Sequence, residues 1–135
     1  MESLYINHFA VWTCAAINLG VGAVWYSPAL FYNVWKKENK LKDEDFENTN
    51  MAKLYAFSFI LALIISYNLA LFLGDEHTDW IWGMYAGFLT GFGFCTMIFV
   101  SIAIFEKRTW RYILINSGYI IFYFTLIGFV LGIWR

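Results

Sequence analysis

Residues 112–134, YILINSGYIIFYFTLIGFVLGIW, form an apolar stretch without a single Asp, Glu, Lys or Arg. A helix rises about 1.5 Å per residue, so about 20 such residues cross a hydrocarbon layer of roughly 30 Å. Helix is the expected form because an isolated strand would leave backbone groups unpaired in lipid. The stretch therefore predicts a membrane-spanning helix at residues 110–134.

Three further charge-free runs precede it, at residues 3–35, 54–73 and 80–105, with charged residues between them. They predict spans at residues 5–27, 52–73 and 80–104. The 135 residues are 61% hydrophobic and 14% charged, whereas soluble domains are roughly 25% charged. We therefore predict an all-α membrane protein whose partner is the lipid bilayer, with residues 1–135 forming a single membrane domain of four transmembrane helices in a bundle.

The first charge-free run is too long for one plain span, and Pro28 divides it. Proline lacks an N–H group and clashes with the preceding turn, so it kinks or ends a helix. Beyond it, residues 29–41 combine apolar side chains such as Phe31 and Trp35 with a polar side that includes Lys36. This pattern predicts a short cytoplasmic helix on the membrane surface. The alternative is a simple extension of the first span.

The basic residues are distributed unevenly between the two sides of a four-span chain. Eight of the nine flank the first and third connections: Lys36, Lys37, Lys40, Lys42, Lys53, Lys107, Arg108 and Arg111. Only Arg135 lies on the other side. Because cytoplasmic loops carry the excess of Lys and Arg, both termini are predicted on the non-cytoplasmic side. The net charge of −1 provides no basic field for nucleic acid.

Each of the last two predicted spans has small residues spaced for close helix contact. They are Gly83, Gly87 and Gly91 in the third span, and Gly118, Thr125, Gly128 and Gly132 on one face of the fourth. Small residues let helix backbones approach closely in lipid. Two interpretations remain open: an interface with another copy or a larger complex, or packing inside the four-helix bundle.

Polar residues form a stripe on each of two spans. The fourth span has Tyr112, Asn116, Tyr119 and Tyr123 at spacings of 4, 3 and 4, and the first has Asn7, Cys14, Asn18 and Trp25 on one face. Polar groups within a bilayer usually turn inward, to a partner or a cavity. The two stripes either line a polar pocket or narrow path, or they bond the helices together.

Groups suited to catalysis or metal binding are sparse. The sequence has no G-x-S-x-G, H-E-x-x-H or P-loop motif. His8 and His77 match no ligand spacing, and Cys14 and Cys95 each lie inside an apolar run. We therefore expect no catalytic residue, metal site or cofactor.

Several segments resemble a known family. They are GAVWYSPALF at residues 22–31 with Asn7 and Trp35, FEKR at 105–108, and INSGY at 115–119. These segments are similar to small bacterial four-span proteins catalogued only as a domain of unknown function. The resemblance covers nearly the whole chain and implies a multi-pass protein of the bacterial cytoplasmic (inner) membrane. It implies no activity.

The Trp25-Tyr26-Ser27-Pro28 motif is also interpretable physically, as the end of a span. Aromatic rings such as those of Trp25 and Tyr26 favour the membrane interface. Ser27 can bond a carbonyl that Pro28 leaves free, and the proline redirects the chain along the surface.

These observations leave three hypotheses for function. The first is a non-catalytic helper or scaffold that assembles with itself, or within a larger membrane complex, through its glycine-rich helix faces. The second is a small homo-oligomeric channel or transporter that carries a neutral or weakly polar solute past Asn18 and Asn116. The third is a membrane enzyme that acts on a lipid or quinone.

Overall fold

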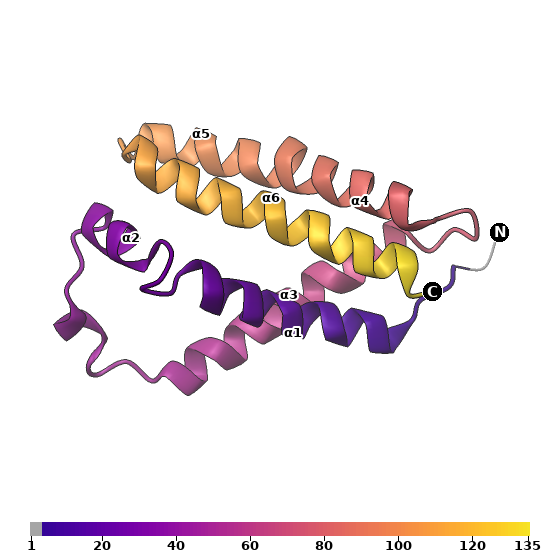
Figure 1. Ribbon diagram of the computed structural model, residues 1–135, viewed down its shortest axis with the longest axis horizontal. Coiled ribbons are helices and arrows are strands. Elements are labelled where there is room, and N and C mark those ends of the chain that lie inside the picture. Colours follow the sequence, from indigo (N-terminus) through magenta and orange to yellow (C-terminus); the bar gives the residue numbers. More distant parts are fainter. Residues whose placement is uncertain (1–3) are drawn as a thin grey trace.

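In a computed structural model that describes residues 4–135, every regular element is a helix. Residues 1–3 of the predicted domain lie outside the described part. The elements are α1 (His8–Trp25), α2 (Tyr32–Glu38), η1 (Asp43–Phe46), α3 (Met51–Phe72), α4 (Trp80–Phe88), η2 (Leu89–Thr96), α5 (Met97–Phe105) and α6 (Trp110–Ile133) (Figure 1). The segments α1, α3, α4 through α5, and α6 are long and apolar enough to cross a membrane. The predicted all-α fold with four such helices is confirmed.

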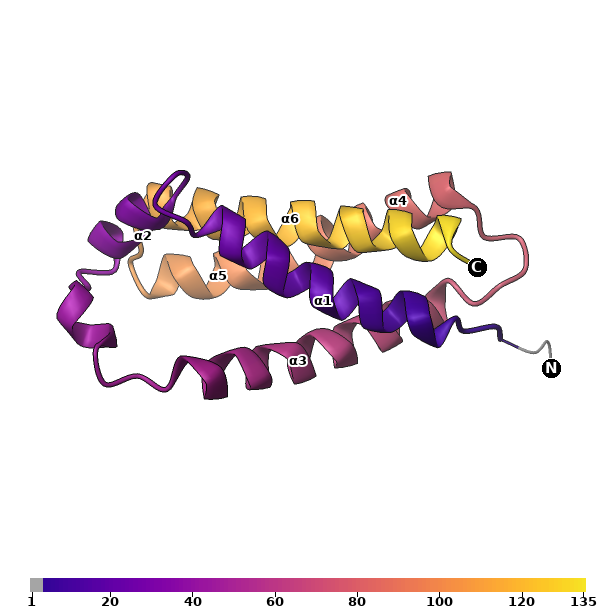
Figure 2. The same cartoon turned by 60° about the horizontal axis from the view of Figure 1, so that its bottom comes forward.

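The helices form an open arrangement rather than a closed ring. Helix α1 packs between α3 and α6, and α6 packs on the α4–η2–α5 segment. Figures 1 and 2 show α3 diverging from the other long helices toward the end that carries α2.

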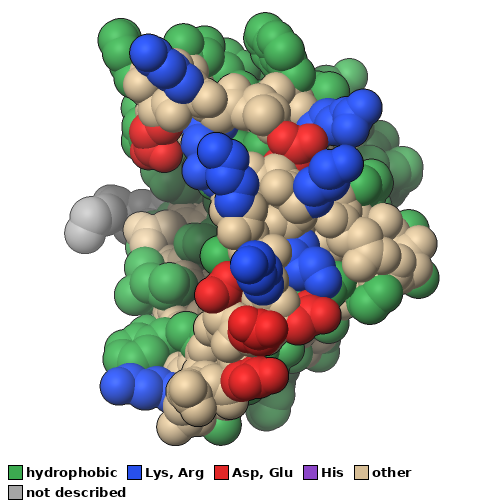
Figure 3. All heavy atoms as spheres, turned by 90° about the vertical axis from the view of Figure 1, so that its left-hand side faces the viewer, with side chains coloured by type: hydrophobic (Ala, Val, Ile, Leu, Met, Phe, Trp, Pro, Cys, Tyr) green, Lys and Arg blue, Asp and Glu red, His purple; other side chains and the backbone are tan. Residues whose placement is uncertain are grey.

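Charged side chains gather at the end of the molecule that carries α2 and the α5–α6 turn (Figure 3). The two ends of the described chain and the α3–α4 connection lie at the opposite end (Figure 1). Contact between the first and third connections is direct, because the Arg108 guanidinium donates to the Asn39 side-chain oxygen and stacks 3.8 Å from the Tyr112 ring centroid. The basic residues of the two connections thus share one end.

Helix α1 begins later than the sequence indicates, because Asn7 caps it. The Asn7 side-chain oxygen accepts a hydrogen bond from the Ala10 N–H at 3.2 Å. Tyr5 lies before the helix and donates its N–H to the Gly74 carbonyl at 3.1 Å. At the other end, the chain turns at Ser27 and Pro28 and then forms α2, which is shorter than the predicted helix at residues 29–41.

The third long segment contains a feature that the sequence did not indicate. Between α4 and α5, residues Leu89–Thr96 form a π-helix. Its wider turn leaves the segment continuous from Trp80 to Phe105. Such segments are rare in proteins and frequent at functional sites.

The closest helix contact joins α4 to α6. A Cβ atom added at Gly83 would lie 2.2 Å from the Gly128 carbonyl oxygen, and one at Gly87 would lie 2.2 Å from the Phe124 carbonyl oxygen. Gly91 and Gly132 make similar approaches, to Phe124 and Asp79. These glycines therefore pack within the chain, where only a residue without a side chain fits.

One glycine departs from the predicted face. A Cβ at Gly118 would lie 2.8 Å from Cζ2 of Trp25 in α1, whereas Gly128 and Gly132 face α4. Gly118 precedes Gly128 by ten residues, and ten residues at 3.6 per turn do not return to the same side of a helix. The small residues of α6 therefore contact two neighbours, α1 at Gly118 and α4 at Gly128.

The buried core lies where α1, α3 and α6 meet. It includes Val11, Cys14, Leu69, Tyr123 and Ile127, each at most 2% exposed. The outer faces are apolar as well: Phe57 in α3 and Ile98 in α5 are 56% and 64% exposed. A lipid solvent would cover these faces without the cost that water imposes.

Candidate functional site

The ends of α1 and α6 are joined through Trp25. Its indole N–H donates to the Ile115 carbonyl oxygen at 2.9 Å, and its ring lies against Gly118. The ring also packs with Phe31 and Phe122. The Trp-Tyr-Ser-Pro segment therefore docks on the Asn-Ser-Gly-Tyr segment of α6 and fixes the end of α1 against it.

Two side-chain hydrogen bonds connect the predicted polar stripes. The Asn18 amide N–H donates to the Tyr119 hydroxyl oxygen at 2.7 Å, and the Tyr26 hydroxyl donates to the Asn116 side-chain oxygen. The rings of Tyr26 and Tyr119 lie 5.5 Å apart. Asn18, Asn116 and Tyr119 are thus brought together as their helical spacing indicated, and Tyr26 joins them.

The remaining members of the stripes lie elsewhere. Asn7 caps α1 at the opposite end of the molecule, and Tyr112 lies beneath the Arg108 guanidinium. The Tyr123 ring stacks on Tyr119 at 6.0 Å between centroids, but its hydroxyl is enclosed by the core near Ser66 and Asn18. These positions do not line the space described next.

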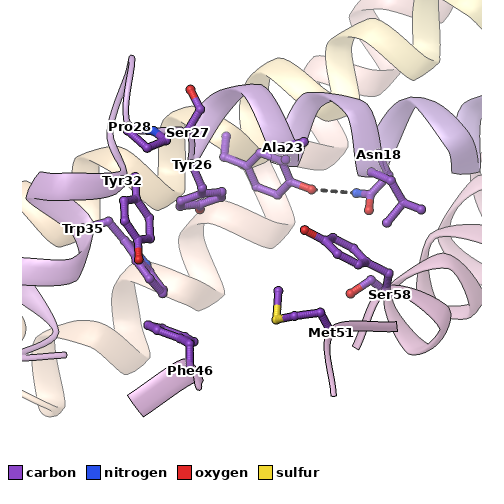
Figure 4. A pocket seen from close by; sticks show the side chains of 14 residues that line it. Asn18, Ala23, Tyr26, Ser27, Pro28, Tyr32, Trp35, Phe46, Met51 and Ser58 are labelled. Atoms are coloured by element: carbon purple, nitrogen blue, oxygen red, sulfur yellow. Dashed lines mark hydrogen bonds between the residues drawn. The ribbon is translucent and has the colours of Figure 1, made fainter. Parts of the chain in front are cut away.

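A cavity of about 560 Å³ opens beside these hydrogen bonds. Its lining includes Asn18, Ala23, Tyr26, Tyr32, Trp35, Phe46, Met51, Tyr55, Ser58 and Tyr119. Figure 4 shows Asn18, Ala23 and Tyr26 on one side, Met51 and Ser58 across from them, and Trp35 and Phe46 toward the end that carries α2. The volume falls in the range of about 300–1,000 Å³ that is typical of small-molecule pockets.

The side of the cavity formed by α3, α2 and η1 was missed in the sequence. Tyr55, Ser58 and the deeper Ser66 lie within a mostly apolar run. Their spacing of three and then eight residues places them on one helix face, which was the available signal. Phe46 carries no such signal, because it reaches the cavity only through the fold of the first connection.

The cavity lining is uncharged, and the charged groups lie at its rim. Lys36 Nζ lies 2.8 Å from Asp43 Oδ1, and the Tyr32 hydroxyl donates to the same oxygen at 3.1 Å. The hydrogen bond from Lys36, followed by that from Tyr32, lowers the pKa of Asp43. The same bond raises the pKa of Lys36. Both groups are therefore charged at neutral pH and balance one another.

The site's chemistry is that of hydrogen bonding and aromatic contact. Its polar groups are the amide of Asn18 and the hydroxyls of serine and tyrosine. Within residues 4–135, no three His, Cys, Asp or Glu side chains cluster closely enough to hold a metal ion. The arrangement is suited to holding a molecule.

Fold and site together define an all-helical protein with four helices long and apolar enough to cross a membrane, and with an aromatic cavity at one end. The chain belongs to the DUF1761 family, described as a protein of unknown function, which it matches over residues 9–132. This match confirms the family of unknown function that the sequence predicted. No curated protein and no solved structure matches the chain.

Proposed function

We propose that this protein is a non-catalytic membrane helper that binds a neutral or weakly polar small molecule in the cavity between α1, α3 and α6. The single observation that carries the proposal is the cavity itself, with about 560 Å³ of space and an uncharged lining. Pockets of this size, largely apolar and with a few convergent polar groups, are typical ligand sites.

The inner end of the cavity favours binding over conduction. Beyond Tyr119 the interior of the protein is filled by buried side chains, those of Val11, Cys14, Tyr123 and Ile127. A solute that entered from the α2 end would therefore stop beside Asn18 and Tyr119. The geometry supports a site that is closed at its inner end.

Photo-crosslinking tests the proposal. A neutral alkylphenol carrying a diazirine is added to the protein in lipid nanodiscs, and the labelled peptides are mapped by mass spectrometry. We expect labels in α1 and in the first half of α3. Ala23→Trp fills the cavity and should abolish them, whereas Ile98→Trp, on the exposed face of α5, should not. Equal labelling of both variants would refute a ligand site in the cavity.

A second candidate is a homo-oligomeric transporter for the same class of solute. It is favoured by the polar groups that continue inward from the cavity, since Asn18 and the buried Ser66 both lie near the Tyr123 hydroxyl. A moving or assembled form could extend this line into a path. Solute flux into liposomes should then fall in Asn18→Leu and Asn116→Leu, and unchanged flux would exclude this candidate.

We also propose that copies assemble, with themselves or within a larger membrane complex. Because Gly83 and Gly128 face each other within the chain, the contact would use other apolar faces. The outer face of α3, where Leu61 is 60% exposed, is one such face. Leu61→Cys should give disulfide-linked dimers in membranes, and Phe105→Cys, which is exposed on α5, is the control. Monomers from both variants would contradict assembly through α3.

For orientation, we infer that the cavity opens toward the cytoplasm of a bacterial inner membrane. The support is the charge distribution, with eight basic residues in the connections at the cavity end and Arg135 at the other. Reporter fusions test this directly. A periplasm-active reporter fused after Arg135 should be active, and one inserted after Lys42 should be silent. The reverse pattern would overturn the orientation.

A further inference from the structure

We propose that the cavity selects a ligand whose polar head is a neutral hydroxyl group attached to a ring-bearing apolar body. This inference rests on the proposed function, because it names the class of molecule that the same cavity would hold. It follows from the hydrogen-bonding roles already occupied around Asn18 and Tyr119, and from the uncharged aromatic walls.

The first step concerns unused hydrogen-bonding capacity. Within residues 4–135, the Tyr119 hydroxyl oxygen accepts a hydrogen bond from the Asn18 amide N–H at 2.7 Å. A tyrosine hydroxyl is both donor and acceptor, so the Tyr119 proton remains available. Asn18 uses its N–H group in this bond, which leaves its side-chain oxygen available as an acceptor.

Two polar groups close to Asn18 and Tyr119 are already committed, whereas Ser58 lies across the cavity. The Tyr26 hydroxyl proton is donated to Asn116, and the Trp25 N–H is donated to Ile115. The adjoining donor and acceptor at the inner end are therefore those of Tyr119 and Asn18. A ligand hydroxyl satisfies both, since it accepts from the tyrosine and donates to the amide oxygen. An ether or a carbonyl can only accept.

The second step concerns charge. Among the fourteen residues that line the cavity, none is Asp, Glu, Lys or Arg. A charged head group would lose its hydration without meeting an opposite charge, which is costly in an apolar site. The charged pair at the rim, Lys36 and Asp43, is already satisfied by mutual contact at 2.8 Å. The lining therefore discriminates against carboxylates and ammonium groups.

The third step concerns shape. Tyr26, Tyr32, Trp35, Phe46, Tyr55 and Tyr119 surround the space. Aromatic walls favour offset or edge-to-face contact with another ring. Met51 and Tyr55 of α3 line the cavity and are 44% and 50% exposed, so an apolar tail can extend outward beside them. The molecule that fits these features is a ring-bearing alcohol or phenol with an apolar tail.

Four matched probes test this selection by competing with the diazirine probe in zwitterionic nanodiscs. They are 4-octylphenol, 4-octylanisole, 4-octylbenzoate and 4-octylbenzylammonium. The phenol has the hydroxyl, the anisole is neutral but cannot donate, and the other two are charged. Free concentrations of each probe are measured. We expect the phenol to compete at about tenfold lower concentration than any other probe, since one additional hydrogen bond has about that effect on binding.

The matched variants are Tyr119→Phe and Tyr112→Phe, the same change on the same helix inside and outside the cavity. Tyr119→Phe removes the donor from which both neutral probes accept, so it should weaken competition by the phenol and by the anisole about tenfold, whereas Tyr112→Phe should alter neither. If the phenol and the anisole compete equally, hydroxyl selection is wrong although the cavity still binds. If no probe competes and no label reaches the cavity, the proposed function itself fails.

Discussion

The two sides of α6 illustrate opposite ways of packing helices. On one side, Gly83 and Gly128 bring the backbones of α4 and α6 so close that an added Cβ would lie 2.2 Å from a carbonyl oxygen. On the other side, Trp25 and Tyr26 at the end of α1 reach α6 through long side chains that end in hydrogen bonds. The first contact leaves no space between the helices. The second holds α1 farther from α6, and a cavity opens beside this contact.

The difference teaches where a site can form in a protein this small. Glycine contacts gain dispersion energy over the whole backbone and make a firm wall. Contacts through aromatic side chains span a greater distance, so a third helix can lean away and leave a hollow. The rigid α4–α6 pair thus supports the Tyr119 and Asn116 side chains. These side chains form the hydrogen bonds between α6 and the α1 side of the cavity.

The largest effect is expected from Gly128→Ala in the tight contact. The new Cβ would lie 2.1 Å from the Gly83 carbonyl oxygen, and because a backbone cannot swing away, the helices must separate. We expect a loss of about 3 kcal/mol or more, the upper end for overpacking. Unfolding in mixed SDS micelles, followed by circular dichroism, measures it. Gly20→Ala is the control, since nothing lies within 4 Å of its Cβ; equal stability of the two variants would contradict the close contact.

Gly118→Ala makes the same change on the looser side. Its Cβ would lie 2.8 Å from the far edge of the Trp25 ring, which can move. We expect a smaller loss of about 1–2 kcal/mol, together with displacement of the Trp25 ring from Gly118. The same unfolding assay gives the energy, and the shift of the Trp25 indole N–H signal in NMR spectra reports the displacement. A loss as large as that of Gly128→Ala would erase the distinction between the two sides.

The hydrogen bond between Tyr26 and Asn116 should contribute less again. A double-mutant cycle with Tyr26→Phe and Asn116→Leu isolates the pair. Polar contacts between helices in membranes contribute about 0.6–2 kcal/mol, so we expect a coupling energy of about 1 kcal/mol. Additive effects of the two substitutions would mean that this bond does not join α1 to α6.

The smallest effect is expected at the cavity rim. The bond from Lys36 lowers the pKa of Asp43 in the folded state below its unfolded value. The contribution to stability is therefore complete above the unfolded pKa and is lost as the pH falls through the lowered one. Asp43→Asn should remove this part of the pH dependence of stability. The effect should be small because ion pairs at a surface contribute little. Unfolding midpoints of both proteins measured against pH would show it, and superimposable profiles would contradict it.

Much of the fold could be predicted because lipid imposes simple requirements. Long charge-free runs had to be helices, Pro28 had to interrupt the first of them, and the spacing of Gly83 and Gly87 had to place them on one face. The sequence could not choose the partner of that face, since a neighbouring helix and a second copy present the same small residues. The structure places Gly128 opposite within the chain.

The site was only half visible in the sequence. Asn18 and Asn116 were found because amides are costly in lipid and stand out. Tyr55 and Ser58 were not, because single hydroxyl-bearing residues in an apolar run are common and carry information only once the tilt of α3 is known. Asn7 shares the stripe's periodicity but caps α1, since a spacing pattern cannot tell a helix end from a helix face. The π-helix at Leu89–Thr96 depends on contacts between helices and has no local signature.

The central claim is that the α1–α3–α6 junction encloses a space that admits a small molecule. Thiol labelling tests it most directly, in protein whose Cys14 and Cys95 are replaced by alanine. Single cysteines are then placed at Ala23 in the cavity, at Ala103, which is 2% exposed, and at Ile98, which is 64% exposed. The account predicts that a small, neutral, water-soluble maleimide labels Ala23→Cys far faster than the other two, and that 4-octylphenol slows this labelling. Equal rates at all three positions, or a rate at Ala23→Cys that 4-octylphenol leaves unchanged, would contradict it.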